Sequence, residues 1–212
     1  MNPTPSVGLV DDDPALRRAL TRLLSAGGFS VRSFSSAADL LNSLNHPDPP
    51  PPDCLILDVQ MPDTGGLDLL DLLNAAGLDI PVVFLTGHGT IPLTVRAMKN
   101  GALNVLTKPV NDTDLFAAVH AALATAATRK AHHSRTADAR KRLASLTPRE
   151  REVMTHLITG KLNKQTAAHL QTCEQTIKVH RMRILRKLEI RSIAELTRLA
   201  ADLNIDPAPH TT

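Results

Sequence analysis

Apolar and polar positions alternate along the first 110 residues in a way that predicts short buried strands separated by amphipathic helices. The predicted strands are residues 7–10, 29–34, 54–57, 82–85 and 104–107, four of which contain an apolar run, at 7–10, 54–57, 82–85 and 105–106. A segment with apolar residues at helical spacing follows each strand. Five such units predict an α/β fold built on a doubly wound, five-stranded parallel sheet, with the flavodoxin-like strand order 2-1-3-4-5.

Polar side chains follow four of these predicted strands. Asp11 and Asp12 come after the first strand, Asp58 after the third, Thr86 after the fourth and Lys108 close behind the fifth. The carboxyl ends of the strands line the ligand-binding crevice of an open parallel sheet, so these residues are expected to converge. The first and third strands are neighbours in the expected order, which brings the three carboxylates together.

The chemistry of such a cluster points to a divalent cation and a phosphoryl group. Clustered carboxylates repel one another unless a cation neutralises them, and Mg²⁺ needs only a few oxygen ligands plus water. The ammonium group of Lys108 and the hydroxyl group of Thr86 are suited to bind the oxygens of an incoming phosphoryl group.

The last 67 residues follow a different pattern, which predicts a small all-α domain. Apolar residues at helical spacing indicate four helices, beginning near residues 148, 163, 174 and 192. The three residues 171–173 form a tight turn between the second and third of these helices. Two short helices joined in this way predict a helix-turn-helix, whose second helix enters the major groove of DNA.

The helix expected over residues 174–188 carries polar and basic residues on the side away from its apolar residues, which are Ile177, Ile184, Leu185 and Leu188. Such residue types pair with phosphates and base edges. The candidate DNA-contacting residues are Lys164, Gln175, Thr176, Lys178, Val179, Arg181, Met182, Arg183 and Arg186. A basic amphipathic helix alone also fits a solvated surface, so the assignment depends on the preceding helix and turn as well.

Between these two regions, residues 125–145 are rich in Ala, Arg and Lys and contain neither Gly nor Pro. This composition favours a helical linker. The expected organisation is therefore a domain over residues 1–124, a linker over 125–145 and a second domain over 146–212. The proline run within residues 46–53 is interpreted as a stiff surface loop rather than a docking peptide.

Charge separates the same two regions. Residues 1–124 carry 7 basic and 13 acidic side chains, a net charge of −6. Residues 125–212 carry 17 basic and 8 acidic side chains, a net charge of +9. The basic region suits a polyanion such as nucleic acid, although a solvated basic surface without a partner is the alternative.

Cysteine content and hydropathy indicate where the protein works. Cys54 and Cys173 form no disulfide or metal-ligand spacing, which is typical of reduced thiols. The N-terminus lacks the layout of a signal peptide, and no apolar run approaches the ~18 residues of a membrane span. We therefore expect a soluble, cytoplasmic protein with no membrane partner.

Six motifs in order resemble one family across nearly the whole chain. They are Val10–Pro14 (VDDDP), Leu57–Asp63 (LDVQMPD), Leu85–Gly89 (LTGHG), Thr107–Pro109 (TKP), Leu146–Val153 (LTPREREV) and Thr176–Arg181 (TIKVHR). The first four resemble the receiver domain of two-component response regulators, and the last two resemble a LuxR-type helix-turn-helix. The chain is thus similar to the FixJ-like response regulators.

This resemblance implies a role for each residue of the strand-end cluster. Asp58 would accept a phosphoryl group from a sensor histidine kinase. Asp12, Asp58 and the main-chain carbonyl of Gln60 would hold Mg²⁺, with Asp11 completing the acidic pair. In the same family pattern, Thr86 would sense the phosphoryl oxygen, and Lys108, before a cis proline at Pro109, would neutralise it.

The resemblance also implies partners and an active state. The protein would regulate transcription by binding double-stranded promoter DNA, as a homodimer when phosphorylated, with RNA polymerase as a further partner. Two positions depart from the family pattern. Val105 replaces the aromatic residue usually found three positions before the strand-five lysine, and Gln60 lies where the side chain influences hydrolysis of the phosphoryl group.

Other function classes fit the sequence less well. A Mg²⁺-dependent phosphatase could use Asp58 as a nucleophile, but Gln60 cannot supply the second carboxylate that such enzymes use as an acid and base. Binding of the basic domain to RNA or protein is another alternative. Four Phe and no Tyr or Trp argue against stacking on single strands. No glycine-rich phosphate loop follows the first strand, which disfavours nucleotide binding.

Overall fold

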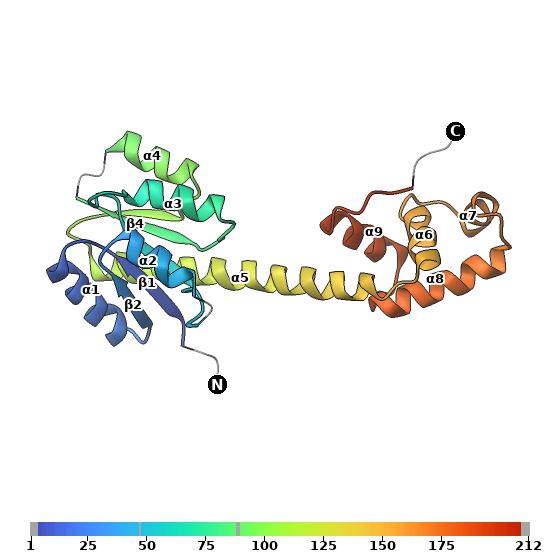
Figure 1. Ribbon diagram of the computed structural model, residues 1–212, viewed down its shortest axis with the longest axis horizontal. Helices are drawn as coiled ribbons and strands as arrows, with labels where there is room; N and C mark the ends of the chain where they lie inside the picture. The colour runs from blue at the N-terminus through green and yellow to red at the C-terminus, as the bar shows by residue number, and fades with distance from the viewer. Residues whose placement is uncertain (1–3, 47, 88–89, 209–212) are drawn as a thin grey trace. The chain divides into compact units, whose positions relative to one another are not determined.

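The computed structural model describes residues 4–46, 48–87 and 90–208 (Figure 1). Its sheet consists of β1 (Ser6–Val10), β2 (Ser30–Phe34), β3 (Cys54–Asp58), β4 (Val82–Thr86) and β5 (Asn104–Thr107). All neighbouring strands are parallel, in the order β2-β1-β3-β4-β5. The predicted doubly wound sheet and its strand order are therefore confirmed.

Five helices cover the two faces of this sheet (Figure 1). They are α1 (Pro14–Ala26), α2 (Ala37–Leu44), α3 (Gly66–Ala75), α4 (Ile91–Lys99) and α5 (Asp112–Ala144). Apolar residues of α2, α3 and α4 form one buried cluster with the sheet, and those of α1 and α5 form another on the opposite face. The central strand β3 is buried along its whole length, as expected for a strand covered on both faces.

The start of α3 lies against the backbone at the end of β3. A Cβ atom at Gly66 would lie 2.2 Å from the carbonyl oxygen of Asp58. Only glycine therefore permits this approach without a shift of the backbone. The close packing holds Asp58 at the carboxyl edge of the sheet, with α3 beginning directly beside it.

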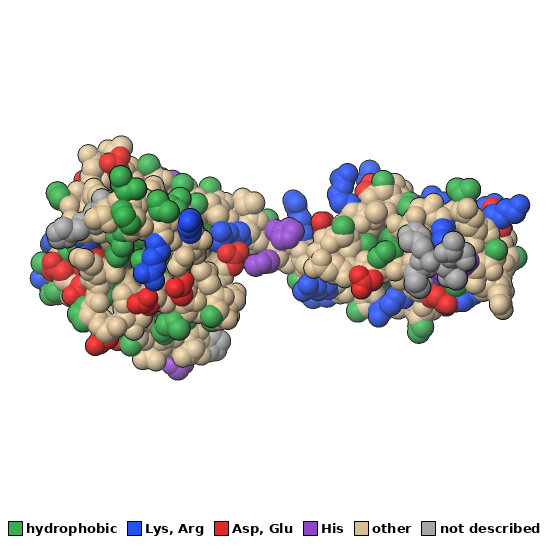
Figure 2. All heavy atoms as spheres, turned by 90° about the horizontal axis from the view of Figure 1, so that it is seen from above, with side chains coloured by type: hydrophobic (Ala, Val, Ile, Leu, Met, Phe, Trp, Pro, Cys, Tyr) green, Lys and Arg blue, Asp and Glu red, His purple; other side chains and the backbone are tan. Residues whose placement is uncertain are grey.

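Helix α4 exposes apolar side chains to the solvent. Ile91, Val95 and Met98 are spaced at i, i+4 and i+7, so they share one face of the helix. Ile91 is 81% exposed. In Figure 2, which looks down on α4, hydrophobic side chains gather on the N-terminal part of the molecule.

Residues 1–129 and 130–212 form two compact units, which we call the N-terminal unit and the C-terminal unit. The C-terminal unit contains α6 (Pro148–Leu157), α7 (Asn163–His169), α8 (Glu174–Leu188) and α9 (Ile193–Asp202). These helices and the end of α5 enclose a separate apolar core. The predicted all-α domain with four helices of its own is thus present.

A capping box begins α6. The Thr147 hydroxyl accepts a hydrogen bond from the backbone N–H of Glu150, and the Glu150 carboxylate accepts one from the N–H of Thr147. Such caps satisfy backbone groups that have no partner within the helix. Glu150 is buried and also pairs with Lys187 of α8 at 2.6 Å, which ties α6 to α8.

Within residues 4–46, 48–87 and 90–208, none of the helices combines the length and apolar character needed to cross a bilayer.

Candidate functional site

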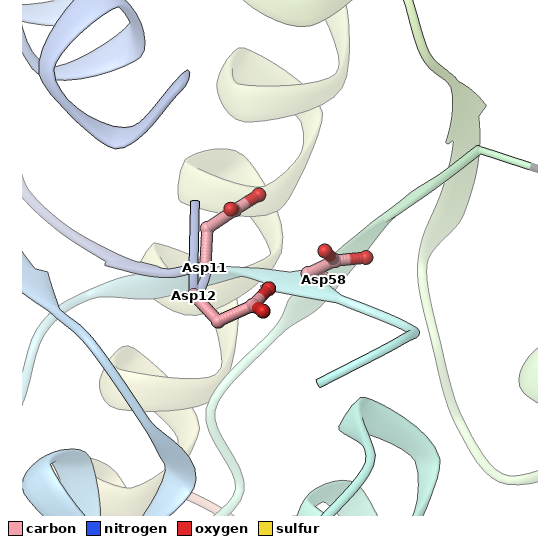
Figure 3. Close-up of side chains that lie close together, drawn as sticks. All are labelled: Asp11, Asp12 and Asp58. Atoms are coloured by element: carbon pink, nitrogen blue, oxygen red, sulfur yellow. The ribbon is translucent and has the colours of Figure 1, made fainter. Parts of the chain in front are cut away.

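Three carboxylates meet at the carboxyl edge of the sheet (Figure 3). Asp11 and Asp12 follow β1, and Asp58 is the last residue of β3. One oxygen from each carboxylate lies within 4.8 Å of the others. Asp11 and Asp58 are buried, whereas Asp12 is exposed. The structure thus brings together the three aspartates whose convergence the strand pattern predicts.

Lys108 connects two of these carboxylates. Its Nζ atom lies 2.7 Å from Oδ2 of Asp11 and 2.7 Å from Oδ2 of Asp58. The backbone N–H of Lys108 donates to the carbonyl oxygen of Thr86, which fixes the start of the β5–α5 loop. The peptide bond between Lys108 and Pro109 is cis. An ammonium group is therefore held against the side chain of Asp58.

Burial and charge act against each other at this site. Burial raises the pKa of the Asp11 carboxyl, although hydrogen bonds and charge from Lys108 favour its ionised form. Desolvation disfavours the charged form of Lys108, but its contacts with Asp11 and Asp58 outweigh that effect and raise its pKa. The lysine therefore stays protonated, and its charge compensates two carboxylates that would otherwise repel one another.

The donor set is compatible with Mg²⁺. Octahedral Mg²⁺ binds oxygens at ~2.1 Å, so opposite ligands lie up to about 4.2 Å apart. The carboxylate oxygens of Asp11, Asp12 and Asp58 would need only a small approach to reach this spacing. Asp12 is exposed, so water can complete the coordination. The N–H of Gln60 donates to Oδ1 of Asp58 at 3.1 Å, which places residue 60 beside the cluster.

The two predicted switch residues lie on neighbouring strands. Thr86 ends β4 and is fully buried, and its backbone carbonyl accepts the hydrogen bond from Lys108. Val105 on β5 is half-buried and opposite Phe84 of β4. The loop that follows Thr86 includes His88 and Gly89 of the LTGHG motif, which lie outside the described residues.

Two contacts hold the turn beside the site, and only the second, a helix cap formed by Asp followed by Pro, has a clear signal in the sequence. Nη1 of Arg17, on α1, donates to the carbonyl oxygen of Asp11 at 2.6 Å. The Asp13 carboxylate caps α1 by accepting from the N–H groups of Ala15 and Leu16, and this lowers its pKa. Together these contacts hold the turn that carries Asp11 and Asp12. The hydrogen bond between Arg17 and the Asp11 carbonyl joins residues six positions apart, a spacing that by itself predicts no contact.

The C-terminal unit contains the second candidate site, on α7 and α8. The buried residues of α8 are Ile177, Ile184 and Leu188, whereas Leu185, which the periodicity also places on the packed side, is half-buried. Of the candidate DNA-contacting residues, the exposed ones are Lys164, Gln175, Lys178, Met182, Arg183 and Arg186. The half-buried ones are Thr176, Val179 and Arg181. Most of the candidate set therefore lies on an accessible face.

Within this face, Lys178 forms an ion pair with Glu174 at 3.1 Å, one helical turn away. Both side chains are about half exposed, and such surface pairs contribute little to stability. The ammonium group of Lys178 is therefore accessible and only weakly held by Glu174.

Comparison with known proteins yields the same two parts. The family model described as response regulator receiver domain matches residues 7–120, and the one described as bacterial regulatory proteins, luxR family, matches residues 144–200. The chain is similar to the response regulator protein TodT of Pseudomonas putida, with 41% identity over 92% of this chain and 85% of that protein.

Two further relatives match along nearly their full length. The transcriptional regulatory protein FixJ of Azorhizobium caulinodans is 40% identical, over 97% of this chain and 96% of that protein. The solved structure of the response regulator StyR matches with a TM-score of 0.77 and 40% identity, covering 93% of this chain and 98% of that one.

Proposed function

The chain belongs to the response regulators that join a receiver domain to a LuxR-type DNA-binding domain, and we propose that Asp58 is its phosphoacceptor. It is a two-component transcription regulator. We assign the phosphoacceptor domain to residues 1–124, the linker to 125–145 and the DNA-binding domain to 146–212. The single observation that carries the assignment of Asp58 is the contact of its carboxylate with Lys108 beside Asp11.

The surroundings of Asp58 suit attack on a phosphoryl group. Its Oδ1 accepts from the N–H of Gln60, and its Oδ2 faces Lys108, so both oxygens are oriented. Phosphoryl transfer needs alignment and charge neutralisation more than covalent help from the protein. Lys108 supplies a positive charge where the oxygens of the transferred group would lie, and Thr86 supplies a hydroxyl at the adjacent strand end.

A divalent cation completes this scheme. Asp11, Asp12, Asp58 and the main-chain carbonyl of Gln60 would hold Mg²⁺, which when bound supplies the positive charge that a phosphoryl donor needs. Asp12 is exposed and has the freedom to adjust to the ion. The donor is a sensor histidine kinase, the partner that a receiver domain implies.

Through α8, the C-terminal unit binds double-stranded DNA. We assign the contacts with base edges to Lys178 and Met182, which are exposed and one helical turn apart. Arg181, Arg183 and Arg186 then contact mainly phosphates. Contacts to phosphate position the protein, whereas contacts to base edges select the sequence.

The active state in this proposal is a homodimer. Exposed Ile91, Val95 and Met98 on α4 form an apolar strip that a second copy can cover. Val105 has no ring to rotate, so the signal from Asp58 is expected to reach this strip through Thr86 and the loop after it. Paired DNA-binding domains engage two half-sites and gain affinity through effective concentration, and the bound dimer can then contact RNA polymerase.

Three variants test these assignments. Acetyl phosphate with Mg²⁺ should add one phosphoryl group to the wild type and none to Asp58→Asn, measured by intact-protein mass spectrometry. Uptake by Asp58→Asn at the wild-type rate means that another residue is the acceptor.

Thr86→Ala should still take up phosphate but fail to dimerise in light scattering, whereas Val105→Ala should dimerise nearly as the wild type does. A phosphorylated Thr86→Ala protein that dimerises normally removes Thr86 from the switch.

A further inference from the structure

The C-terminal unit contains a hollow of about 390 Å³ on the surface formed by α5, α6 and the segment after α9. Its main lining residues are Arg140, Leu143, Arg151, Met154, Leu203 and Ile205. None of them is among the candidate DNA-contacting residues. The volume lies in the range of pockets that hold small organic molecules, ~300–1,000 Å³.

The floor of this hollow is apolar and fixed by the core of the unit. Met154 is fully buried, and Leu143 and Ile205 pack against the same apolar cluster. The backbone N–H of Ala208 donates to the carbonyl oxygen of Thr155 at 3.1 Å, so the segment carrying Ile205 is held against α6. The hollow therefore has a defined apolar surface that does not depend on a ligand for its shape.

Two arginines stand at the edge of this apolar floor, and both are exposed. In the part of the chain that the structure describes, neither Arg140 nor Arg151 forms an ion pair. Arg151 makes one long hydrogen bond, from Nη2 to the carbonyl oxygen of Leu143 at 3.4 Å. The acidic neighbour of Arg151, Glu152, pairs with Arg149 instead. The positive charge at the edge is therefore not neutralised by nearby carboxylates.

We propose that this hollow binds a small organic carboxylate with an apolar body, such as an aromatic acid or a medium-chain fatty acid. The apolar body would lie over Leu143, Met154 and Ile205. Its carboxylate would accept hydrogen bonds from Arg140 and Arg151, whose guanidinium groups present pairs of N–H donors that match a carboxylate.

A small acid fits these features better than a protein partner does. The hollow is lined by residues of α5, α6 and the segment around Ile205, and its volume is that of one ligand of modest size. Because the lining joins three separate segments, a bound acid would hold them together and stabilise the C-terminal unit. The site is thus a place where a metabolite can act on the DNA-binding part of the protein without competing with DNA.

The test uses the full chain with benzoate, phenylacetate and octanoate as probes, and the amide of each acid as its neutral counterpart. Binding is measured by protein-observed NMR and by isothermal titration calorimetry. At least one acid should bind, shift resonances of Leu143 and Ile205, and bind about tenfold or more tightly than its neutral counterpart. The double variant Arg140→Gln/Arg151→Gln should lose about tenfold or more of that affinity.

Arg198→Gln is the matched control, since Arg198 is an exposed arginine of α9 outside the lining. It should bind the acid as the wild type does, and both variants should keep the wild-type circular dichroism spectrum. Failure of all three acids to bind at millimolar concentration overturns the proposal. Equal binding of the acid by the double variant, or equal binding of the neutral amide by the wild type, also overturns it.

Discussion

The two candidate sites of this protein are built in opposite ways. The aspartate cluster of the N-terminal unit is largely buried, and its side chains come from different strand ends that are far apart in the sequence. The DNA-binding face of the C-terminal unit is exposed and lies mostly on the single helix α8. A buried cluster depends on every member, whereas an exposed face works by the sum of many weaker contacts. The first should therefore respond to substitution with near-complete loss and the second with graded loss.

The largest effect is expected at Lys108. Lys108→Ala removes the ammonium group 2.7 Å from both Asp11 and Asp58, so the phosphoryl group would lose its main side-chain countercharge. Loss of one such preorganised group costs about 10²–10³ in rate. Phosphorylation of the variant by acetyl phosphate, followed by mass spectrometry, should slow by that factor. Lys99→Ala, an exposed lysine at the end of α4, is the control and should react at the wild-type rate.

If the phosphorylation rate of Lys108→Ala fell less than threefold, the buried cluster would tolerate the loss of a central member. The expected difference between the two sites would then be wrong.

The next effect sharpens the comparison, because the C-terminal unit also contains an ion pair between the buried carboxylate of Glu150 and the half-buried ammonium group of Lys187. The hydrogen bond from Lys187, followed by that from the N–H of Thr147, lowers the pKa of Glu150 to about 2 from its ordinary 4.5. Glu150→Gln should reduce the free energy of unfolding by about 2–3 kcal/mol near pH 7, since the charge of Lys187 loses its partner. Urea denaturation measures this. Glu152→Gln changes an exposed glutamate of the same helix and should cost well under ~1 kcal/mol.

The contribution of Glu150 to the free energy of unfolding depends on pH. The folded-state pKa of Glu150 lies below its unfolded value, so its contribution is complete above pH 4.5 and is lost as the pH falls toward 2. The difference in stability between the wild type and Glu150→Gln should therefore shrink over this range. A constant difference from pH 7 to pH 3 would show that the ion pair is not its source.

The smallest effects are expected on the exposed face of α8. Lys178→Ala should cost ~1–3 kcal/mol on the preferred duplex and relax sequence choice, because Lys178 is assigned to base edges. Arg183→Ala should weaken binding to all duplexes alike and reduce the salt slope by about one. Fluorescence anisotropy on a specific and a random duplex separates the two. Equal losses on both duplexes for Lys178→Ala would show that it contacts phosphate only.

The two sites also differ in how far the sequence predicts them, because one is assembled from separate strand ends and the other lies mostly on one helix. Asp11, Asp12 and Asp58 were predictable as a cluster because parallel strands end at one edge, so strand order alone brings them together. The face of α8 follows from its apolar periodicity. That periodicity separates the buried side of the helix from the exposed side only coarsely. Thr176, Val179 and Arg181 are half-buried, although they are among the candidate DNA-contacting residues.

The contacts that the sequence does not reveal are those between segments of unrelated spacing. Glu150 and Lys187 are 37 residues apart, and no periodicity connects them. Arg17 reaches the carbonyl of Asp11 through a turn whose shape depends on the Asp13 cap. The hollow beside Arg140 and Arg151 requires the segment after α9 to fold back on α6, which only the packed structure shows.

The central claim is that phosphorylation of the buried cluster controls the exposed DNA-binding face. The most direct test measures duplex affinity with and without acetyl phosphate and Mg²⁺, for the wild type and for Asp58→Asn, with phosphate uptake determined on the same samples. We expect the phosphodonor to tighten DNA binding by the wild type and to leave the DNA affinity of Asp58→Asn unchanged. An equal gain in affinity for both proteins, or none for a fully phosphorylated wild type, would contradict it.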